Sequence, residues 1–382
     1  MTVLLIPDKF KGSLTAAEVI SALSKGIERA DNSTEIHHLI ASDGGDGFLD
    51  AIQQHMEVEE VSCAALDPLG REIIASYLVN LNKGVAFIEL AKTSGMEMLA
   101  AGERNPKITS TLGAGLQIRD AVERGLQTIY IGLGGSATND GGIGIAEAMG
   151  YKFLDAAQNV LKPSGESLDK IQSIDAMNVH KDLKRISIVA VNDVDNPLYG
   201  ATGAAFVYAK QKGATIRDIE ILDEGLKNLD RVVQQQMGAT NALVPGAGAA
   251  GGAAYGIMTF LGGTFVSGIS FMLHLADIDT LVKNRKIDLI ITGEGKIDDQ
   301  TFSGKLIHGV MGFGSSNAIP VVAICGTLGL DKEVCIEKGL HAVLEIRDPS
   351  KSLAFNMENA ATLLENCIFQ YMGATGAQQQ LK

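Results

Sequence analysis

The chain has 382 residues, of which 46% are hydrophobic and 20% charged, so it can bury sizeable cores in two or three globular domains. Its net charge of −13, without a long basic block, argues against a nucleic-acid partner, because phosphate backbones are bound by clustered Lys and Arg. The four cysteines are scattered and form no C-x-x-C pair, which indicates a reducing cytoplasm and argues against structural zinc.

Two apolar stretches could be mistaken for targeting or membrane segments. Residues 1–6 are too few for an export signal and run directly into Asp8 and Lys9. Residues 232–276 contain no charged side chain, but Pro245 and repeated glycines interrupt them before an apolar run of membrane length can form. We therefore expect a cytoplasmic protein that has no membrane partner.

The N-terminal part of the chain predicts two strand–loop–helix units in succession. Val3–Pro7 and Glu35–Ile40 are the expected strands, and Ala16–Arg29 and Phe48–His55 are the expected helices. Thr15 has the properties of an N-cap for the first helix. This order is typical of a parallel α/β sheet.

Residues 58–107 change character and favour antiparallel pairing. Val58–Cys63, Ile73–Leu81 and Val85–Leu90 are rich in β-formers, and Asn82-Lys83-Gly84 predicts a hairpin turn between the last two. A helix is then expected from Thr109/Ser110 to Glu123.

The stretch that follows predicts an anion-binding loop. A short strand, Ile129–Gly132, leads into a glycine-rich loop and a helix over Ile143–Met149. Glycine lets a phosphate approach the backbone, and N–H groups near a helix N-terminus favour negative charge.

Two other interpretations of this loop remain open. One is an ordinary capped turn, in which Ser136, Thr138 or Asn139 caps the helix. The other is a dinucleotide site, because Gly132-x-Gly134-x-x-Ala137 matches the G-x-G-x-x-G/A fingerprint and Asp155 follows at a suitable distance. Against the second, polar and glycine residues 139–142 occupy the place where the helix should begin.

The rest of the chain alternates between expected strands and helices. The expected strands are Tyr151–Leu154, Ile186–Val191, Ala204–Ala209, Asp288–Thr292, Pro320–Cys325 and Ala342–Ile346, and the expected helices are Arg217–Gln236, Ala249–Phe260, Phe271–Lys283 and Ser352–Tyr371. The spacing predicts an α/β protein with a Rossmann-like parallel-sheet domain formed by both chain ends and an inserted second, mixed α/β domain. We assign residues 1–57, 106–148 and 284–382 to the first domain and residues 58–105 and 149–283 to the second, with the active site in the cleft between them.

Carboxylates, lysines and glycines recur at the ends of the expected strands. They are Asp8, Lys9, Lys11, Asp43, Asp46, Ser136, Thr138, Asn139, Asp140, Asp193, Asp195, Glu294, Lys296, Asp298 and Asp299. Each alone is more typical of a turn or a helix cap, but ligands of parallel sheets bind at this edge. Together they are the parts that phosphoryl transfer requires, although the P-loop, protein-kinase, zincin and α/β-hydrolase motifs are absent from the sequence.

With these loops in view, the sequence resembles the bacterial glycerate kinase family over most of its length. The resemblance rests on seven blocks in the same order: Pro7–Leu14, Asp43–Gly47, Asp67–Arg71, Ile131–Gly142, Asp193–Leu198, Pro245–Gly252 and Thr292–Gln300. Departures from the family pattern are Lys9 for Ser, Asp46 for Glu, Phe48 for Thr and Asn192 for Cys.

The resemblance implies ATP-dependent phosphorylation of D-glycerate with Mg²⁺, by a two-domain protein whose cleft closes on the substrate. It favours 2-phosphoglycerate over 3-phosphoglycerate as the product and leaves a homodimer open. Two other functions stay open from the residues: an NAD(P)-dependent oxidoreductase of a small hydroxy acid, and a non-catalytic hydroxy-acid sensor.

We assign roles to site residues from their loop positions. The expected nucleotide-binding residues are Gly134, Gly135, Ser136, Thr138, Asn139, Gly248 and Glu294. Asp193 and Asp43 are expected to bind Mg²⁺ or to accept the hydroxyl proton, with Asp298 as a further metal ligand. Lys11 and Arg71 are expected to hold the glycerate carboxylate or the transferring phosphoryl group.

Overall fold

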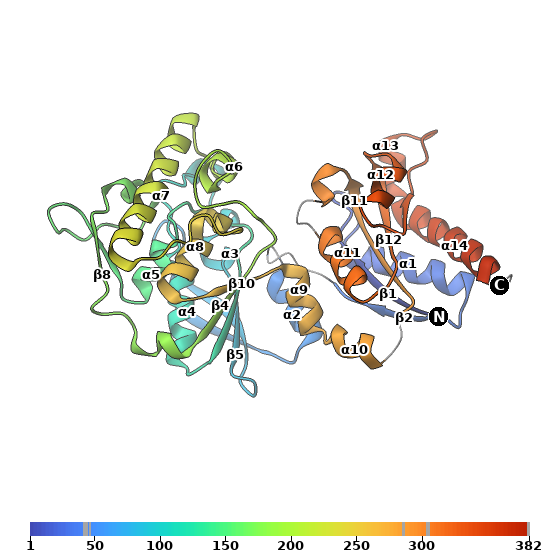
Figure 1. The fold of residues 1–382 in the computed structure, drawn as a ribbon, viewed down its shortest axis with the longest axis horizontal. Helices are drawn as coiled ribbons and strands as arrows, with labels where there is room; N and C mark the ends of the chain where they lie inside the picture. The colour runs from blue at the N-terminus through green and yellow to red at the C-terminus, as the bar shows by residue number, and fades with distance from the viewer. Residues whose placement is uncertain (41–44, 46, 285–286, 303–305, 380–382) are drawn as a thin grey trace. The chain divides into compact units, whose positions relative to one another are not determined.

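The computed structural model describes residues 1–40, 45, 47–284, 287–302 and 306–379. The chain forms two compact units (Figure 1). Unit 1 combines Met1–Ala41 with Ile269–Lys382, and unit 2 is the continuous segment Ser42–Gly268.

Unit 1 is built on a five-stranded sheet that both chain ends supply. Its strands are β1 (Thr2–Pro7), β2 (Glu35–His38), β11 (Leu289–Ile297), β12 (Val321–Leu328) and β13 (Ala342–Glu345). Their order is β13-β12-β11-β1-β2, and every neighbouring pair is parallel. The predicted parallel sheet from the two chain ends is confirmed, because β1 pairs with β11 across almost the whole sequence.

The helices of unit 1 are α1 (Ala16–Ala30), α9 (Gly268–Leu275), α10 (Ile278–Asn284), α11 (Leu306–Ser316), α12 (Lys332–Glu337), α13 (Leu353–Glu358) and α14 (Ala360–Gln379). Figure 1 shows α1 and α14 side by side, and both contribute to one buried cluster with β1, β11 and β12. At their crossing, a Cβ on Gly26 would lie 2.4 Å from the carbonyl oxygen of Glu365, so only glycine permits this approach.

Unit 2 contains a mixed six-stranded sheet in the order β10-β9-β6-β5-β4-β3. Its strands are β3 (Glu59–Leu66), β4 (Glu72–Asn80), β5 (Val85–Glu89), β6 (Thr128–Gly132), β9 (Ser187–Val191) and β10 (Thr264–Val266). The β3–β4–β5 meander is antiparallel, as residues 58–107 predict, whereas β5, β6, β9 and β10 run parallel. A separate ribbon joins β7 (Lys152–Leu154) to β8 (Ser173–Asp175).

The helices of unit 2 are α2 (Phe48–His55), α3 (Ala91–Ser94), α4 (Leu112–Glu123), α5 (Ile143–Ala148), α6 (Ala204–Tyr208), α7 (Ile216–Met237) and α8 (Ala249–Leu261). One large buried cluster joins the sheet to α4, α5, α7 and α8. The long uncharged segment 232–276 contributes α8 and β10 to this unit, which explains its apolar composition.

The structure differs from the predicted domain boundaries in three places. Residues 106–148 were expected in the domain of the chain ends, but β6 pairs with β5 and β9 in the sheet of unit 2. Residues 47–57, with α2, also belong to unit 2, whereas residues 269–283, expected in the second domain, belong to unit 1. A strand–helix period gives the type of each element but not its neighbours in the sheet, so β6 could not be assigned to the correct sheet.

Several elements of the structure differ in type or length from those predicted. Ala204–Ala209, predicted as a strand, forms α6, and the predicted helix Phe271–Lys283 is divided into α9 and α10 near Asp277, which has a φ of 51°. The helix predicted over Ser352–Tyr371 is similarly divided into α13 and α14.

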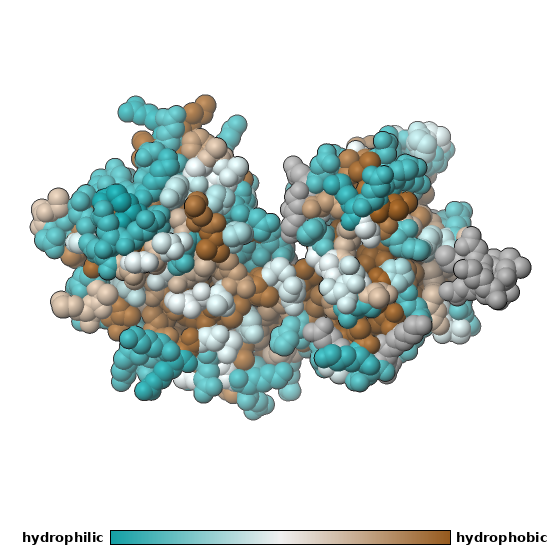
Figure 2. Space-filling model, in the orientation of Figure 1, coloured by the Kyte–Doolittle hydropathy of each residue, from teal (hydrophilic) through white to brown (hydrophobic). Residues whose placement is uncertain are grey.

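The surface and the helix lengths bear on the membrane prediction. Among the described residues, no helix is long and apolar enough to cross a bilayer. On the face drawn in Figure 2, hydrophilic and hydrophobic residues are interspersed over both units.

Candidate functional site

The glycine-rich loop after β6 lies at the carboxyl edge of the sheet in unit 2. The neighbouring strands extend the pairing at this edge, because Leu90 N–H donates to Gly132 O at 3.0 Å and Leu133 N–H donates to Val191 O at 3.2 Å. The ends of β5, β6 and β9 therefore meet here. This edge is where open parallel sheets bind ligands.

The first half of this loop presents unpaired backbone donors. Gly135 has a φ of +68°, Met96 N–H donates to Gly135 O at 2.9 Å, and Ala137 N–H donates to Ser94 O at 2.8 Å. No described residue accepts a hydrogen bond from the N–H groups of Gly134, Gly135 or Ser136. Successive free N–H groups around a left-handed residue form a concave site that suits an anion.

A buried lysine from a distant part of the chain braces the same loop. Lys212 ends the short 3₁₀ helix Lys210–Lys212 and is 3% exposed. Its Nζ donates to Ser136 Oγ at 2.8 Å and to Thr138 O at 2.7 Å. Burial lowers the pKa of Lys212 to about 7, although the charge of Asp140 opposes the shift.

The second half of the loop turns into the protein. Thr138, Asn139 and Asp140 are fully buried, and the Thr138 hydroxyl donates to Ala250 O at 3.4 Å. The side-chain oxygen and nitrogen of Asn139 are both buried and contact no described hydrogen-bonding partner. Of the predicted nucleotide residues in this loop, Gly134 and Gly135 thus lie at its surface, whereas Ser136, Thr138 and Asn139 are buried.

Asp140 holds the loop to α4 and α5. Its carboxylate accepts from the N–H and hydroxyl of Thr111 at 2.8 and 2.9 Å and from the N–H of Gly142 at 3.1 Å. Burial raises the pKa of Asp140, and these hydrogen bonds oppose the rise. We assign Asp140 to the support of the loop.

The dinucleotide fingerprint does not have its expected geometry. α5 begins at Ile143 after Gly142, whereas the fingerprint requires a helix to start at Ala137. Asp155 accepts hydrogen bonds from the N–H groups of Ala157 and Asn159 in its own exposed turn. These two observations remove the structural basis for the nicotinamide alternative.

Gly248 lies in a second glycine-rich segment that packs against this loop. A Cβ on Gly248 would lie 2.3 Å from Pro197 O, and a Cβ on Gly251 would lie 2.0 Å from Thr138 O. Ala250, Gly251 and Gly252 have φ values of 53°, 67° and 87°. Close packing therefore accounts for these glycines, and the predicted contact between Gly248 and a nucleotide stays a prediction.

Asp193 follows β9 at the same edge as the loop. Its Oδ1 accepts from the N–H of Gly268 at 2.8 Å, and its side chain is half-buried. The preceding Asn192 accepts from Val194 N–H at 3.2 Å, and its Nδ2 is buried without a described hydrogen-bonding partner.

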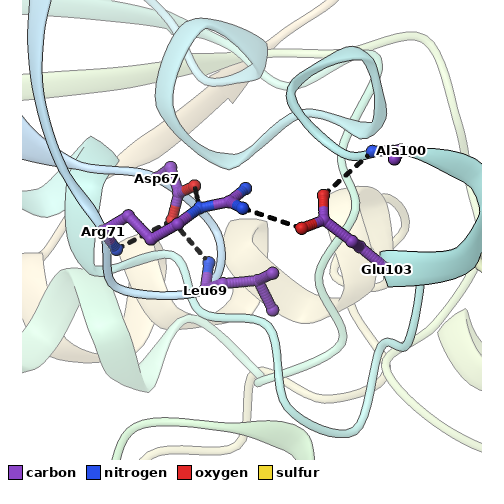
Figure 3. A network of polar contacts seen from close by, with 5 residues as sticks. All are labelled: Asp67, Leu69, Arg71, Ala100 and Glu103. Carbon is purple, nitrogen blue, oxygen red and sulfur yellow. Dashed lines mark hydrogen bonds and ion pairs between the residues drawn. The ribbon is translucent and has the colours of Figure 1, made fainter.

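Arg71 is held by two carboxylates (Figure 3). Its Nε donates to Asp67 and its Nη1 donates to Glu103 at 2.8 Å, whereas Nη2 makes no contact with the residues drawn. Burial would raise the pKa of Asp67, but hydrogen bonds from Arg71 and Leu69 lower it overall. Two of the donor nitrogens of Arg71 are thus already used within unit 2.

Unit 1 has a cavity of about 400 Å³ beside the carboxyl ends of its strands. It collects the predicted residues Lys11, Glu294 and Asp298, together with Lys9, Lys296 and Arg347. Glu294 lies within β11 and accepts from the Thr301 hydroxyl at 2.5 Å, and Lys296 pairs with Asp298 at 3.1 Å. The apolar part of the cavity wall is formed by Phe10, Ile346, Leu353, Met357 and Ala360.

The predicted metal ligands come from separate parts of the chain. No group of three or more His, Cys, Asp or Glu side chains suited to a metal occurs among the described residues. Asp193 belongs to unit 2 and Asp298 to unit 1, and Asp43 lies outside the described residues, as does Asp46. Mg²⁺ in phosphotransferases needs only one or two carboxylates besides phosphates and water, so Asp193, Asp298 and Glu294 have suitable chemistry.

Lys212 and Glu89 are two buried charged residues that were not predicted from the sequence. Glu89 ends β5, is 3% exposed, and accepts from Leu49 N–H at 3.3 Å. A charged residue directly after the aliphatic strand residues could have indicated Glu89, whereas Lys212 sits in a polar Lys-Gln-Lys run that predicts an exposed surface.

The chain is similar to known proteins in both sequence and structure. The model of the glycerate kinase family matches residues 3–375. A glycerate kinase of Bacillus cereus is 39% identical, covering 91% of this chain and 90% of the relative, and a glycerate 2-kinase of Escherichia coli is 36% identical with the same coverage. A crystal structure from Salmonella typhimurium LT2, described as that of a candidate glycerate kinase 2, has a TM-score of 0.81 and 33% identity, covering 100% of this chain and 99% of that chain.

Proposed function

The chain belongs to the glycerate kinase family, and from this premise we propose that it transfers the γ-phosphoryl group of ATP to D-glycerate, yielding 2-phosphoglycerate. The single observation that supports the chemistry best is the loop after β6. There, no described residue accepts a hydrogen bond from the N–H groups of Gly134, Gly135 and Ser136, and the Ser136 hydroxyl contacts the buried Nζ of Lys212. Such a loop binds phosphate oxygens without needing a Walker motif.

The anions of this reaction need positive partners, because the chain as a whole carries −13. We assign the ATP phosphates to Gly134, Gly135 and Ser136, and we keep Thr138, Asn139, Gly248 and Glu294 as proposed nucleotide contacts. Lys11 and Arg71 are proposed to hold the glycerate carboxylate or the transferring phosphoryl group, since lysine and arginine both suit these anions.

Mg²⁺ is proposed to be held by Asp193 or Asp298, with Asp43 as a further candidate. When bound, the ion would neutralise the negative charge that develops during phosphoryl transfer. Asp193 alternatively accepts the proton of the glycerate hydroxyl. Its placement beside the loop after β6, at the edge where β6 and β9 end, supports either role.

A coupled assay of ADP release with ATP, Mg²⁺ and either D-glycerate or L-glycerate tests the proposal. We expect turnover that depends on D-glycerate and an NMR spectrum of the product with phosphorus on the C2 oxygen. A C3 phosphate would correct the regiochemistry. Absence of ADP release with both enantiomers would refute the kinase, and binding without turnover would favour the hydroxy-acid sensor.

A further inference from the structure

Lys212 has surroundings that are unusual for a lysine. It is 3% exposed, and no described carboxylate forms an ion pair with it. Burial of an ammonium without a paired charge carries a desolvation cost, and this cost lowers the pKa of Lys212 to about 7. The two groups that it contacts, Ser136 Oγ and Thr138 O, lie on either side of the predicted anion loop.

The charged form of Lys212 restricts the direction of the Ser136 hydroxyl. When charged, the ammonium has only donors, so Nζ occupies a lone pair of Ser136 Oγ and a lone pair of Thr138 O. The hydroxyl hydrogen of Ser136 must then point away from Lys212. Ser136 is 6% exposed, and the adjacent Gly135 is exposed.

We propose that Lys212 is a positioning residue for the ATP phosphates, which pins Ser136 and Thr138 together and directs the Ser136 hydroxyl outward as a hydrogen-bond donor. The proposal rests on the proposed kinase function. Lys212 reaches the ligand through Ser136 and through its charge beneath the loop. A phosphate above the loop in turn stabilises the charged form of Lys212, because opposite charges attract more strongly where water is excluded.

A purely structural role would give different results. If Lys212 only braced the loop, its removal would lower thermal stability, while folded molecules would keep their nucleotide affinity. If it positions the phosphate donors, affinity falls in molecules that remain folded. D-glycerate affinity serves as an internal reference, because the proposal assigns the loop to the nucleotide.

The test compares Lys212→Met with Lys210→Met in the full chain. Lys210 lies in the same 3₁₀ helix but is exposed, so its variant controls for loss of one positive charge in this region. Calorimetry with the non-hydrolysable analogue AMP-PNP and Mg²⁺ should show roughly 10- to 100-fold weaker binding for Lys212→Met, the equivalent of one charge-assisted hydrogen bond, and no change for Lys210→Met. The KM for ATP should rise by a similar factor, with the KM for D-glycerate unchanged.

Ser136→Ala provides a second test of the proposal if Lys212→Met does not fold. It retains the lysine and removes the directed hydroxyl, so AMP-PNP affinity should fall, and the double variant should lose less than the sum of the two single losses. Unchanged affinity in folded Lys212→Met, or in Ser136→Ala if the former is unfolded, overturns the proposal. If nucleotide affinity is unchanged and turnover is normal, only the role of Lys212 is overturned and the kinase function stands. If the wild-type protein shows neither AMP-PNP binding nor turnover, the kinase function and the role of Lys212 are both overturned.

Discussion

At the scale of single residues, the carboxylates and glycines of the candidate site were predictable and its buried cation was not. Asp193 and Gly134 to Ser136 follow strands, and that position alone marks them, because parallel strands end at one edge. Lys212 reaches Ser136 from 76 residues away in sequence, and no local pattern predicts such a contact.

Asp193 carries the first prediction. Asp193→Asn retains an oxygen for the N–H of Gly268 but removes the negative charge, so we expect a folded protein whose kcat is lower by roughly 10²–10⁴. Asp195→Asn, two residues further along the same loop and exposed, should keep near-normal turnover. Steady-state kinetics with matched thermal melts would measure this, and near-normal kcat for Asp193→Asn would refute its catalytic assignment.

Lys212 also predicts how stability depends on pH. Its pKa is about 7 in the folded chain, below the value of about 10.4 for an unfolded lysine, so between these values the unfolded state binds more protons. The free energy of unfolding of the wild type should therefore rise with pH, relative to Lys212→Met, by up to about 1.4 kcal/mol per pH unit.

Denaturant titrations of both proteins between pH 7 and 8.5 would measure this difference. The cysteines are the same in both proteins, so their contribution cancels in the comparison, although burial raises the pKa of Cys63 to about 11 and that of Cys325 to about 12. Their effect has the opposite sign above the usual thiol range, because the unfolded thiols lose their protons first. If the free energy of unfolding depends on pH in the same way in both proteins, Lys212 does not titrate in this range.

At the scale of elements, most strands and helices were predicted, and the errors have local causes. α6 was mistaken for a strand because its sequence, Ala204–Tyr208, is short and apolar and lacks a helical period. The predicted helices are interrupted at Asp277 and Asn359, and no neighbouring proline or glycine in the sequence indicates these interruptions. The placement of β6 in unit 2 depends on pairing with β5 and β9, which is tertiary information.

The crossing of α1 and α14 gives an element-scale prediction. Gly26→Ala should destabilise the protein by about 1–3 kcal/mol, because its methyl group would meet Glu365 O and Ile368, although alanine favours helix by about 1 kcal/mol. Gly312→Ala on α11 is the matched control, since a Cβ there has no atom within 4 Å. Chemical denaturation should show Gly312→Ala to be neutral or stabilising, and equal effects of the two changes would contradict the close packing.

At the scale of the whole molecule, the parallel sheet of the chain ends was predictable because β1, β11, β12 and β13 alternate with helices. The division into two units was harder to predict, because strands and helices alternate in the same way on both sides of the boundary near Ala41. Unit 2 is one continuous segment, whereas unit 1 needs both ends of the chain.

This continuity predicts different behaviour for two fragments. Residues 42–268 contain all strands and the buried cluster of unit 2, so this fragment should fold alone and melt cooperatively. Residues 269–382 lack β1, β2 and α1, which would leave one side of β11 unpaired and the α14 face uncovered, so they should remain unfolded. Circular dichroism melts of both fragments measure this, and a cooperative melt of 269–382 would contradict the prediction.

The pairing of β1 with β11 also sets an order of events during synthesis on the ribosome. β1 is made first, and Val3 to Ile6 are fully buried in the finished protein, yet β11, one of its two partner strands, begins only at Leu289. At about 5–20 residues per second, β1 waits on the order of 15–60 s for that partner. Unit 2 can fold during this interval, so the nascent N-terminal segment is the part of this chain that most needs protection by chaperones.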